Sequence, residues 1–237
     1  TIVPVYQTAT FTLSEPGVTK GFDYSRSGNP TRKALEAQLA SLEGARFGCA
    51  FASGMAAVFG ATAPLRQGDH ILAPRDIYGG THRLFVDLLP RYGITTSYVD
   101  MTDIEATRAA IRPNTKLFWI ETPANPLLSI VDITAIAALK KPGQLVAVDN
   151  TFAMPYLQQP LALGAQMDLH AFGVAQYGPS AAQGDEGSAG PDQRIKPLEV
   201  LHAPQVSHLR DTLDPVGAGA DERDPRGGEG KRPPLEP

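Results

Sequence analysis

The sequence is poor in several features, and each absence excludes a class of protein. A single cysteine, Cys49, occurs in 237 residues, so the chain cannot form an internal disulfide and we expect it in a reducing cytoplasm. No stretch approaches the roughly 20 apolar residues of a membrane span, and the start lacks the charged and apolar segments of a signal peptide. The formal net charge of -4 provides no basic surface for nucleic acid. We therefore expect neither a membrane nor a nucleic-acid partner.

Large apolar residues are also scarce, but only towards the C-terminus. Residues 171–237 contain 10 Gly and 9 Pro but only 11 Leu, Ile, Val and Phe, which is too few to build a core. Residues 1–170 have an average content of Gly and Pro. We predict three parts: an N-terminal arm over residues 1–29, an α/β domain over residues 30–170, and a low-complexity tail over residues 171–237 that is disordered or out of frame.

Residues 30–170 alternate between helical and strand patterns. Short apolar runs predict strands at 49–53, 70–74, 95–100, 116–121 and 144–149. Amphipathic patterns predict helices at 29–45, 54–65, 81–93, 101–111 and 132–141. In the first helix Leu35, Leu39 and Leu42 share one face, and the fourth is expected to begin with a capping box of Thr102 and Glu105. The alternation predicts a parallel sheet with right-handed crossovers.

Polar residues directly follow several predicted strands. Ser53, Glu121 and Asp149 each lie where an apolar run ends. In open α/β sheets ligands bind at this edge. Ser53, Gly54 and Met55 form a strand-to-helix turn whose N–H groups can hold an anion such as a phosphate, although Ser53 is equally typical of a plain helix cap. The chain has no GxGxxG or P-loop pattern, so little supports a nucleotide.

Other residues are candidates for binding a ligand that has a phosphate or a flat heteroaromatic ring. Asp149 could pair with a protonated pyridine nitrogen, or simply close its strand in an Asx turn. Tyr78 precedes two glycines and could stack on a ring, or pack as an ordinary tyrosine. Tyr24 and Arg26 could grip a phosphate, or belong to a solvated loop. Glu121 and Asn125 share a loop stiffened by proline.

These motifs in this order resemble a known family. The stretches "YSRSGNPTR", "SGMAA", "DIYGGT", "ETPANPLL" and "VDNTF" are similar to those of the Cys/Met-metabolism enzymes dependent on pyridoxal 5′-phosphate, the transsulfuration enzymes of cystathionine synthase and lyase type. The resemblance spans Ile2 to His170. It implies the large domain of the aspartate-aminotransferase-like fold (fold type I) without the C-terminal small domain. It also implies a sulfur amino acid as substrate, β- or γ-elimination or replacement chemistry, and a homotetramer of active dimers.

The resemblance also implies a role for each candidate residue. Ser53, Gly54 and Met55 would hold the cofactor phosphate, Tyr78 would stack on the pyridine ring, Asp149 would pair with the ring nitrogen, Asn125 would lie near the ring hydroxyl, and Tyr24 and Arg26 would reach the phosphate of the neighbouring subunit. Gly80 stands where methionine γ-lyases usually have Cys, which argues against that branch, and the stretches "YSRSGNPTR" and "NPLLSIVDI" favour the cystathionine enzymes. No metal ligand is expected.

The resemblance ends where the catalytic residue should be. In the family a strand like "LGAQMDLH" leads to the lysine that forms the Schiff base with the cofactor, but here Val174 occupies that position and Ala171 replaces a phosphate-binding Ser. We interpret the sequence after His170 as the product of a frameshift or a chimeric gene. Three hypotheses follow: a damaged or truncated copy of a transsulfuration enzyme, a non-catalytic subunit that pairs with an intact relative, or an inactive fragment that does not fold.

Overall fold

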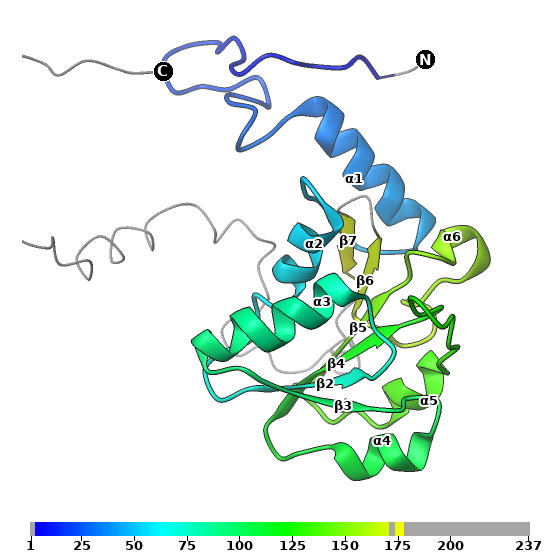
Figure 1. Ribbon diagram of the computed structural model, residues 1–237. Coiled ribbons are helices and arrows are strands. Elements are labelled where there is room, and N and C mark those ends of the chain that lie inside the picture. The colour runs from blue at the N-terminus through cyan, green and yellow to red at the C-terminus, as the bar shows by residue number, and fades with distance from the viewer. Residues whose placement is uncertain (1–2, 171–173, 178–237) are drawn as a thin grey trace, which may run out of the picture. The chain divides into compact units, whose positions relative to one another are not determined.

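The computed structural model describes residues 3–170 and 174–177, in which helices and strands alternate (Figure 1). The strands are β1 (Phe47–Ala50), β2 (His70–Pro74), β3 (Thr95–Val99), β4 (Thr115–Glu121), β5 (Leu145–Asp149), β6 (Met167–His170) and β7 (Val174–Tyr177). The helices are α1 (Pro30–Leu42), α2 (Gly54–Ala61), α3 (Gly79–Arg83), α4 (Ile104–Ala110), α5 (Ile133–Ala138) and α6 (Met154–Leu157). None of the helices in these ranges is long and apolar enough to cross a membrane.

The strands form one seven-stranded sheet in the order β1-β7-β6-β5-β4-β2-β3. The five strands from β3 to β6 are parallel to their neighbours, whereas β7 is antiparallel to both β6 and β1. Since β1 is antiparallel to β7, it runs in the same direction as the parallel set. The predicted α/β class with a mostly parallel sheet is therefore confirmed.

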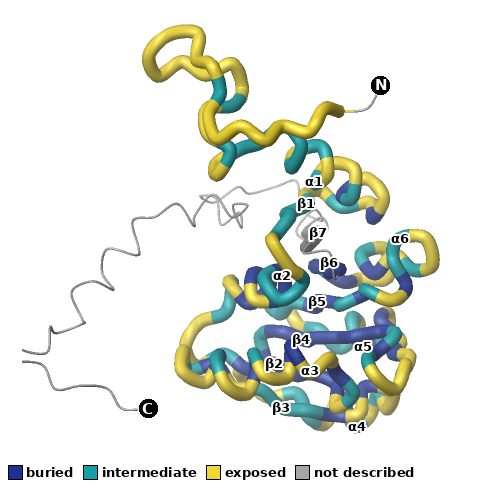
Figure 2. The backbone as a smooth tube through the Cα atoms, turned by 45° about the horizontal axis from the view of Figure 1, so that its top comes forward, coloured by how far each residue is buried: buried dark blue, intermediate teal, exposed yellow. Residues whose placement is uncertain are grey.

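Helices cover both faces of this sheet, because successive side chains of a strand point to opposite sides. Leu117 and Trp119 of β4 pack with α2 and with Phe85 and Leu89, which follow α3. Phe118 and Ile120 of the same strand pack on the other face in a cluster that includes α4 and α5. Both clusters leave β2 and β4 almost without exposed residues, as the dark tube through these strands shows (Figure 2). The central strands are continuous apolar runs because neither face meets water.

The helix predicted over residues 81–93 is one helical stretch that changes pitch. After α3 the chain passes into the π-helix η1 (Leu84–Leu88) and then the 3-10 helix η2 (Leu89–Tyr92). Pro90 lies in the first turn of η2, where a residue without an N–H can be accommodated. Gly93 ends the stretch in a left-handed conformation with φ 72°.

The capping box predicted from Thr102 and Glu105 is wrong. The cap of α4 is Asp103, whose side chain accepts a hydrogen bond from the Ala106 N–H at 2.9 Å. Thr102 instead donates its hydroxyl to Asp100, so it belongs to the preceding turn. Two adjacent residues could each cap this helix, and a carboxylate at the cap position also favours the positive end of the helix dipole.

The apolar face predicted for α1 is largely exposed in this chain. Leu35 is 48 % exposed and Leu42 is 46 % exposed, and Ala40 is the buried residue of the helix. The start and end of α1 follow the prediction, since Asn29 caps Pro30 and Gly44 takes a left-handed conformation with φ 64° after the helix.

The sheet contains a four-residue strand, β7, beyond the predicted limit of the domain at residue 170. Strand β7 lies in the segment assigned to the tail, yet it pairs along its whole length with β6 and β1. The average composition of residues 171–237 conceals this short segment, which is compatible with a strand. The rest of the predicted tail, from residue 178, lies outside the described residues, and its disorder stays a prediction.

Candidate active site

The predicted site residues follow strands that end at the same edge of the sheet. β1 leads into the turn of Ser53, β2 into the loop that carries Tyr78, and β4 into the loop that carries Asn125, while Asp149 ends β5. These four strands share one direction, so their carboxyl ends lie at one edge. Such an edge is where open α/β sheets bind ligands.

Ser53 begins helix α2 and leaves N–H groups next to it free for a ligand. Its hydroxyl oxygen accepts the Ala56 N–H at 3.2 Å, so the helix-cap interpretation of Ser53 is correct. The N–H groups of Gly54 and Met55 belong to the first turn, where no partner exists inside the helix. The helix dipole places positive potential at the same point, which suits a phosphate.

Tyr78 lies beside this turn. A Cβ atom built on Gly80 would come within 2.4 Å of Tyr78 Cε1 and 2.8 Å of Met55 Sδ, so the ring edge and the thioether meet over Gly80. The tyrosine side chain remains 43 % exposed, which leaves ring surface for stacking. Any larger residue at position 80, including cysteine, would force the ring or the thioether to move.

Asp149 combines a structural contact with an unused acceptor. Its Oδ1 accepts the Thr151 hydroxyl at 2.6 Å and the Thr151 N–H at 3.2 Å, which is the Asx turn considered from the sequence. Its Oδ2 takes part in no hydrogen bond among the residues that the structure describes. Burial raises the pKa of this carboxyl above its ordinary value, against the hydrogen bonds from Thr151 and the charge of His170, which lower it. A ring N–H⁺ at Oδ2 would supply the missing donor.

Asn125 is connected to Tyr78 through Glu121. The Glu121 carboxylate accepts the Tyr78 N–H at 2.9 Å through Oε2 and the Asn125 N–H at 2.8 Å through Oε1. Glu121 is only 3 % exposed, and burial raises its pKa to about 7 although both hydrogen bonds lower it. Sequence reasoning placed Glu121 at the edge but missed this bridge, because its partners are backbone groups that no residue pattern reveals.

Asp76 joins the same two loops at a second point. Its Oδ2 accepts the Ser129 hydroxyl at 2.7 Å, and its Oδ1 lies 3.4 Å from the Leu127 N–H. The loops after β2 and β4 are therefore connected by two carboxylates, one beside Tyr78 and one further along.

Tyr24 and Arg26 lie in the arm and contact each other. The Arg26 guanidinium carbon stands 4.8 Å from the centre of the Tyr24 ring, a cation–π distance. No hydrogen bond or ion pair within residues 3–170 joins either side chain to the Ser53 turn, Tyr78 or Asp149. The structure of this single chain thus brings together Ser53 to Met55, Tyr78, Asn125 and Asp149 at one edge, and it leaves the role of the arm as a prediction.

Val174 begins β7, opposite His170 of β6 and Ala50 of β1. Because β7 is antiparallel, its first residue lies at the carboxyl edge of the neighbouring strands. The backbone position that the resemblance assigns to the lysine is therefore at the correct edge, and valine occupies it.

A buried ionic cluster lies next to this edge. His170 Nε2 is 3.0 Å from Glu43 Oε1 and 3.4 Å from Asp168 Oδ2, and all three side chains are fully buried. Burial lowers the pKa of His170, but its hydrogen bonds to Asp168 and Glu43 and their charges outweigh this effect and raise the pKa to about 9. The ligand atoms lie within 4.8 Å of one another, which is compatible with a metal ion. A protonated imidazole already supplies the positive charge, and we interpret the cluster as an ion-pair network.

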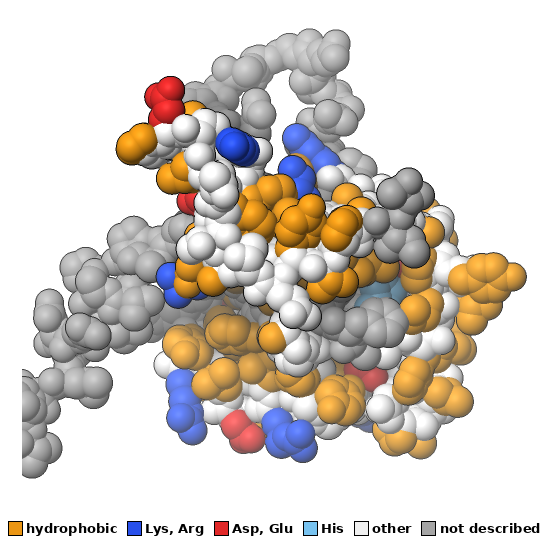
Figure 3. All heavy atoms as spheres, turned by 90° about the horizontal axis from the view of Figure 1, so that it is seen from above, with side chains coloured by type: hydrophobic (Ala, Val, Ile, Leu, Met, Phe, Trp, Pro, Cys, Tyr) orange, Lys and Arg blue, Asp and Glu red, His pale blue; other side chains and the backbone are white. Residues whose placement is uncertain are grey.

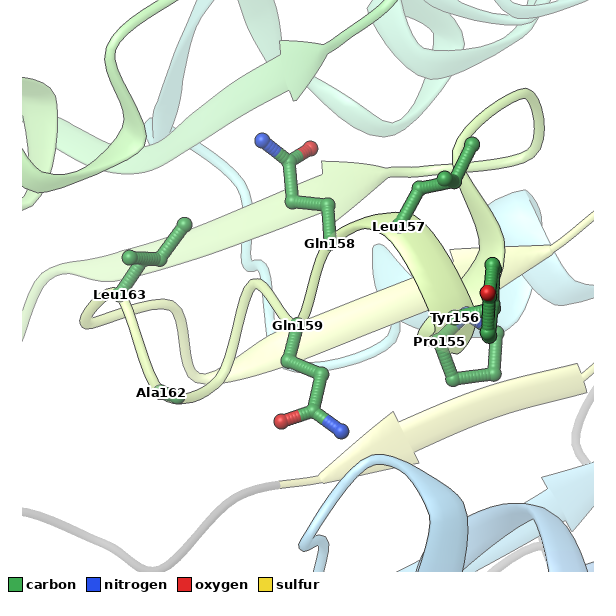
Figure 4. A pocket seen from close by; sticks show the side chains of 7 residues that line it. All are labelled: Pro155, Tyr156, Leu157, Gln158, Gln159, Ala162 and Leu163. Carbon is green, nitrogen blue, oxygen red and sulfur yellow. The ribbon is translucent and has the colours of Figure 1, made fainter.

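A hollow beside α6 is separate from the candidate site. Figure 4 shows it lined by residues 155–159, 162 and 163, none of which is a predicted site residue. Tyr156 and Leu157 are 94 % and 73 % exposed, so this region presents apolar side chains to the outside.

The comparisons with known proteins agree on one family. The family described as Cys/Met metabolism PLP-dependent enzyme matches residues 1–174. The chain is 48% identical over 170 residues to a probable cystathionine gamma-synthase of Herpetosiphon aurantiacus, covering 71% of this chain and 53% of that protein. It is 49% identical over 169 residues to cystathionine gamma-lyase of Bacillus subtilis, covering 71% of this chain and 45% of that protein. The chain thus spans about half the length of the relatives it matches.

Solved structures give the same result. The metB protein of Corynebacterium glutamicum matches with a TM-score of 0.72 and 42% identity, covering 75% of this chain and 50% of that one. Cystathionine gamma-lyase of Lactobacillus plantarum, complexed with L-serine, matches with a TM-score of 0.71 and 43% identity over the same shares. Fold and matches define the class as the large domain of the pyridoxal-phosphate-dependent enzymes of fold type I. The chain belongs to the Cys/Met metabolism PLP-dependent enzyme family.

The described residues fit the phosphate and the ring of this cofactor. The N–H groups of Gly54 and Met55, which have no partner among the described residues, suit the phosphate. The partly exposed Tyr78 ring suits stacking, and Asp149 Oδ2 has no hydrogen bond among the described residues and can accept one. These residues do not provide the covalent attachment to the cofactor, because valine stands at position 174.

Proposed function

We propose that this chain is the cofactor-binding half of a transsulfuration enzyme of sulfur amino-acid metabolism, of the cystathionine synthase or lyase type, in a copy that lacks the covalent lysine. Its substrate would be a small sulfur amino acid that undergoes β- or γ-elimination or replacement. The single cysteine supports a reducing cytoplasm as its compartment.

One observation supports this proposal most strongly. Three elements far apart in the sequence, the start of α2, the loop after β2 and the end of β5, meet at one edge with the groups that a phosphorylated pyridine needs. Pyridoxal phosphate withdraws electrons from the substrate α carbon when it is bound. In our proposal Asp149 keeps the ring nitrogen protonated through Oδ2, Tyr78 orients the ring by stacking, and the Gly54 and Met55 N–H groups hold the phosphate.

The chain is expected to bind pyridoxal phosphate without a covalent bond. Valine at position 174 has no amine to bond to the cofactor or to act as a general base. Borohydride reduction of the loaded chain followed by peptide mapping would show no pyridoxyl group. A pyridoxyl group in good yield on Lys196, or on any other lysine, would show that the covalent residue has been misassigned.

The purified chain is also expected to lack cystathionine-cleaving activity. Loss of a general base alone removes about 10²–10⁴ in rate, and loss of substrate orientation removes more. Release of keto acid from cystathionine is the measurement. Turnover of about 1 per second or more by this chain alone would contradict the proposal.

A second candidate function is a non-catalytic subunit that pairs with an intact relative. The exposed apolar side chains of α1 and α6 favour it, because Leu35, Leu42, Tyr156 and Leu157 are largely uncovered by the residues that the structure describes. Figure 3 shows hydrophobic side chains gathered on the face seen from above. Mixing the chain with an intact relative whose own phosphate-binding Tyr and Arg are mutated would restore turnover through Tyr24 and Arg26. Absence of a mixed oligomer in sedimentation would contradict this candidate.

A further inference from the structure

Glu121 has a role that neither the sequence motif nor the family match assigns. It ends β4 with a carboxylate that is 3 % exposed, and each oxygen accepts the N–H of a different loop, at Tyr78 and at Asn125. Tyr78 is 43 residues away in the chain, so the contact joins two loops rather than closing one turn.

Loop closure alone does not explain a buried carboxylate at this position, because a neutral side chain could accept the same hydrogen bonds with a smaller loss of stability. Both partners are neutral backbone groups, and the neighbouring Asp149 and Asp76 add like charge that raises the Glu121 pKa further, after the larger effect of burial. A buried charge without a cationic partner destabilises a fold, and such groups concentrate at functional sites. Hydrogen bonds to a carboxylate are shorter and stronger than neutral ones, so this group holds its two N–H donors more rigidly than a neutral side chain would.

We propose that Glu121 is a positioning residue, which fixes the spacing between the Tyr78 ring and the Asn125 side chain so that both can contact one pyridine ring. The inference rests on the proposed function, since Tyr78 would stack on that ring and Asn125 would lie near its hydroxyl. Glu121 itself would contact neither the pyridine ring nor its hydroxyl. It acts through the backbone N–H groups of Tyr78 and Asn125, the residues that would contact them.

Asp76 offers a matched control within the same pair of loops. It also connects the segment after β2 with the segment after β4, but its partners are Ser129 and Leu127 rather than Tyr78 and Asn125. Removing one acceptor at position 76 loosens the loops without moving the groups proposed to contact the ring.

The experiment compares Glu121→Gln and Asp76→Asn with the unaltered full chain. Glutamine keeps the size of the side chain but presents an NH₂ to one of the two N–H donors, so one hydrogen bond is lost. Three quantities are measured for each: the melting temperature, the affinity for pyridoxal phosphate with the circular dichroism of the bound cofactor, and the affinity for inorganic phosphate, which needs only the α2 turn.

We expect Glu121→Gln to weaken cofactor binding by about tenfold and to reduce the cofactor dichroism, with phosphate affinity unchanged. Asp76→Asn should lower the melting temperature yet leave both affinities and the dichroism as they were. Equal losses of cofactor affinity in the two variants would mean that Glu121 only holds the two loops together, and would overturn the inference. Unchanged dichroism in Glu121→Gln would also overturn it.

Two further outcomes are distinguishable. If the unaltered chain binds phosphate but no pyridoxal phosphate, the proposed function fails and the positioning role fails with it. If Glu121→Gln does not fold, Glu121→Asp provides the comparison, because it keeps the charge but is too short to reach both N–H groups. Full cofactor affinity in Glu121→Asp would then contradict the inference.

Discussion

Two acidic sites lie near the same edge of the sheet, and they differ in the source of their hydrogen-bond donors. Glu121 and Asp149 end adjacent strands, and their hydrogen-bond donors are backbone N–H groups and a threonine. Glu43 and Asp168 instead share the imidazole of His170. The first site keeps an unused acceptor for a ligand, whereas the second contains its own cation. Burial alone therefore does not distinguish a binding site from a structural one; the presence of a directly bonded cationic side chain does.

The largest effect should follow from removing the cation of the structural site. His170→Gln leaves Glu43 and Asp168 buried beside each other without a positive charge, and breaking a buried pair costs about 3–5 kcal/mol. Urea denaturation followed by the fluorescence of the buried Trp119 measures this loss. The exposed pair of Arg108 and Glu105 is the control, since Glu105→Gln should change stability by no more than about 0.5 kcal/mol. Similarly small losses of stability at both positions would contradict the distinction between the two sites.

The structural site should also impose a pH dependence. The pKa of His170 in the folded chain is about 9, above its ordinary value of 6.5, so the protonated ring stabilises the fold fully below pH 6.5. This contribution is lost as pH rises through 9, a decrease in the free energy of unfolding of about 3 kcal/mol. Denaturation curves between pH 6 and 10 would show the decrease in the unaltered chain and not in His170→Gln. A rise in the free energy of unfolding between pH 6 and 10 would contradict the presence of a buried imidazolium.

The smallest effect on the free energy of unfolding, and the one of opposite sign, is expected at the ligand site. Asp149→Asn keeps the Thr151 contacts but removes a carboxylate whose pKa burial has raised, so it should stabilise the free chain by about 1 kcal/mol. The same substitution should abolish cofactor binding, because a neutral amide cannot hold a protonated ring nitrogen. Thermal denaturation with and without pyridoxal phosphate separates the two effects. Destabilisation of the free chain would mean that Asp149 is structural, like Asp168.

The parallel strands could be predicted because their residues are continuous apolar runs buried on both faces. β2 and β4 lie close to where their sequences placed them, and so do the polar residues that follow. Other features depend on partners distant in the chain. No local pattern reveals that Glu121 binds the Tyr78 N–H or that His170 pairs with Glu43, 127 residues away. The cap of α4 was mistaken because Thr102 and Asp103 are both good caps, and only the path of the preceding turn selects Asp103.

The position of β7 also sets an order of events during synthesis. Among the residues that the structure describes, β1 is hydrogen-bonded in the sheet through β7 alone, so residues 47–50 have no strand partner in that part of the chain until residues 174–177 have left the ribosome. The strands between them can pair one after another as they emerge, but the first strand has to wait for the last. Contacts this far apart in the sequence close slowly, and an unpaired strand is open to wrong partners meanwhile. The segment where this chain departs from its relatives is therefore the segment that would complete the sheet.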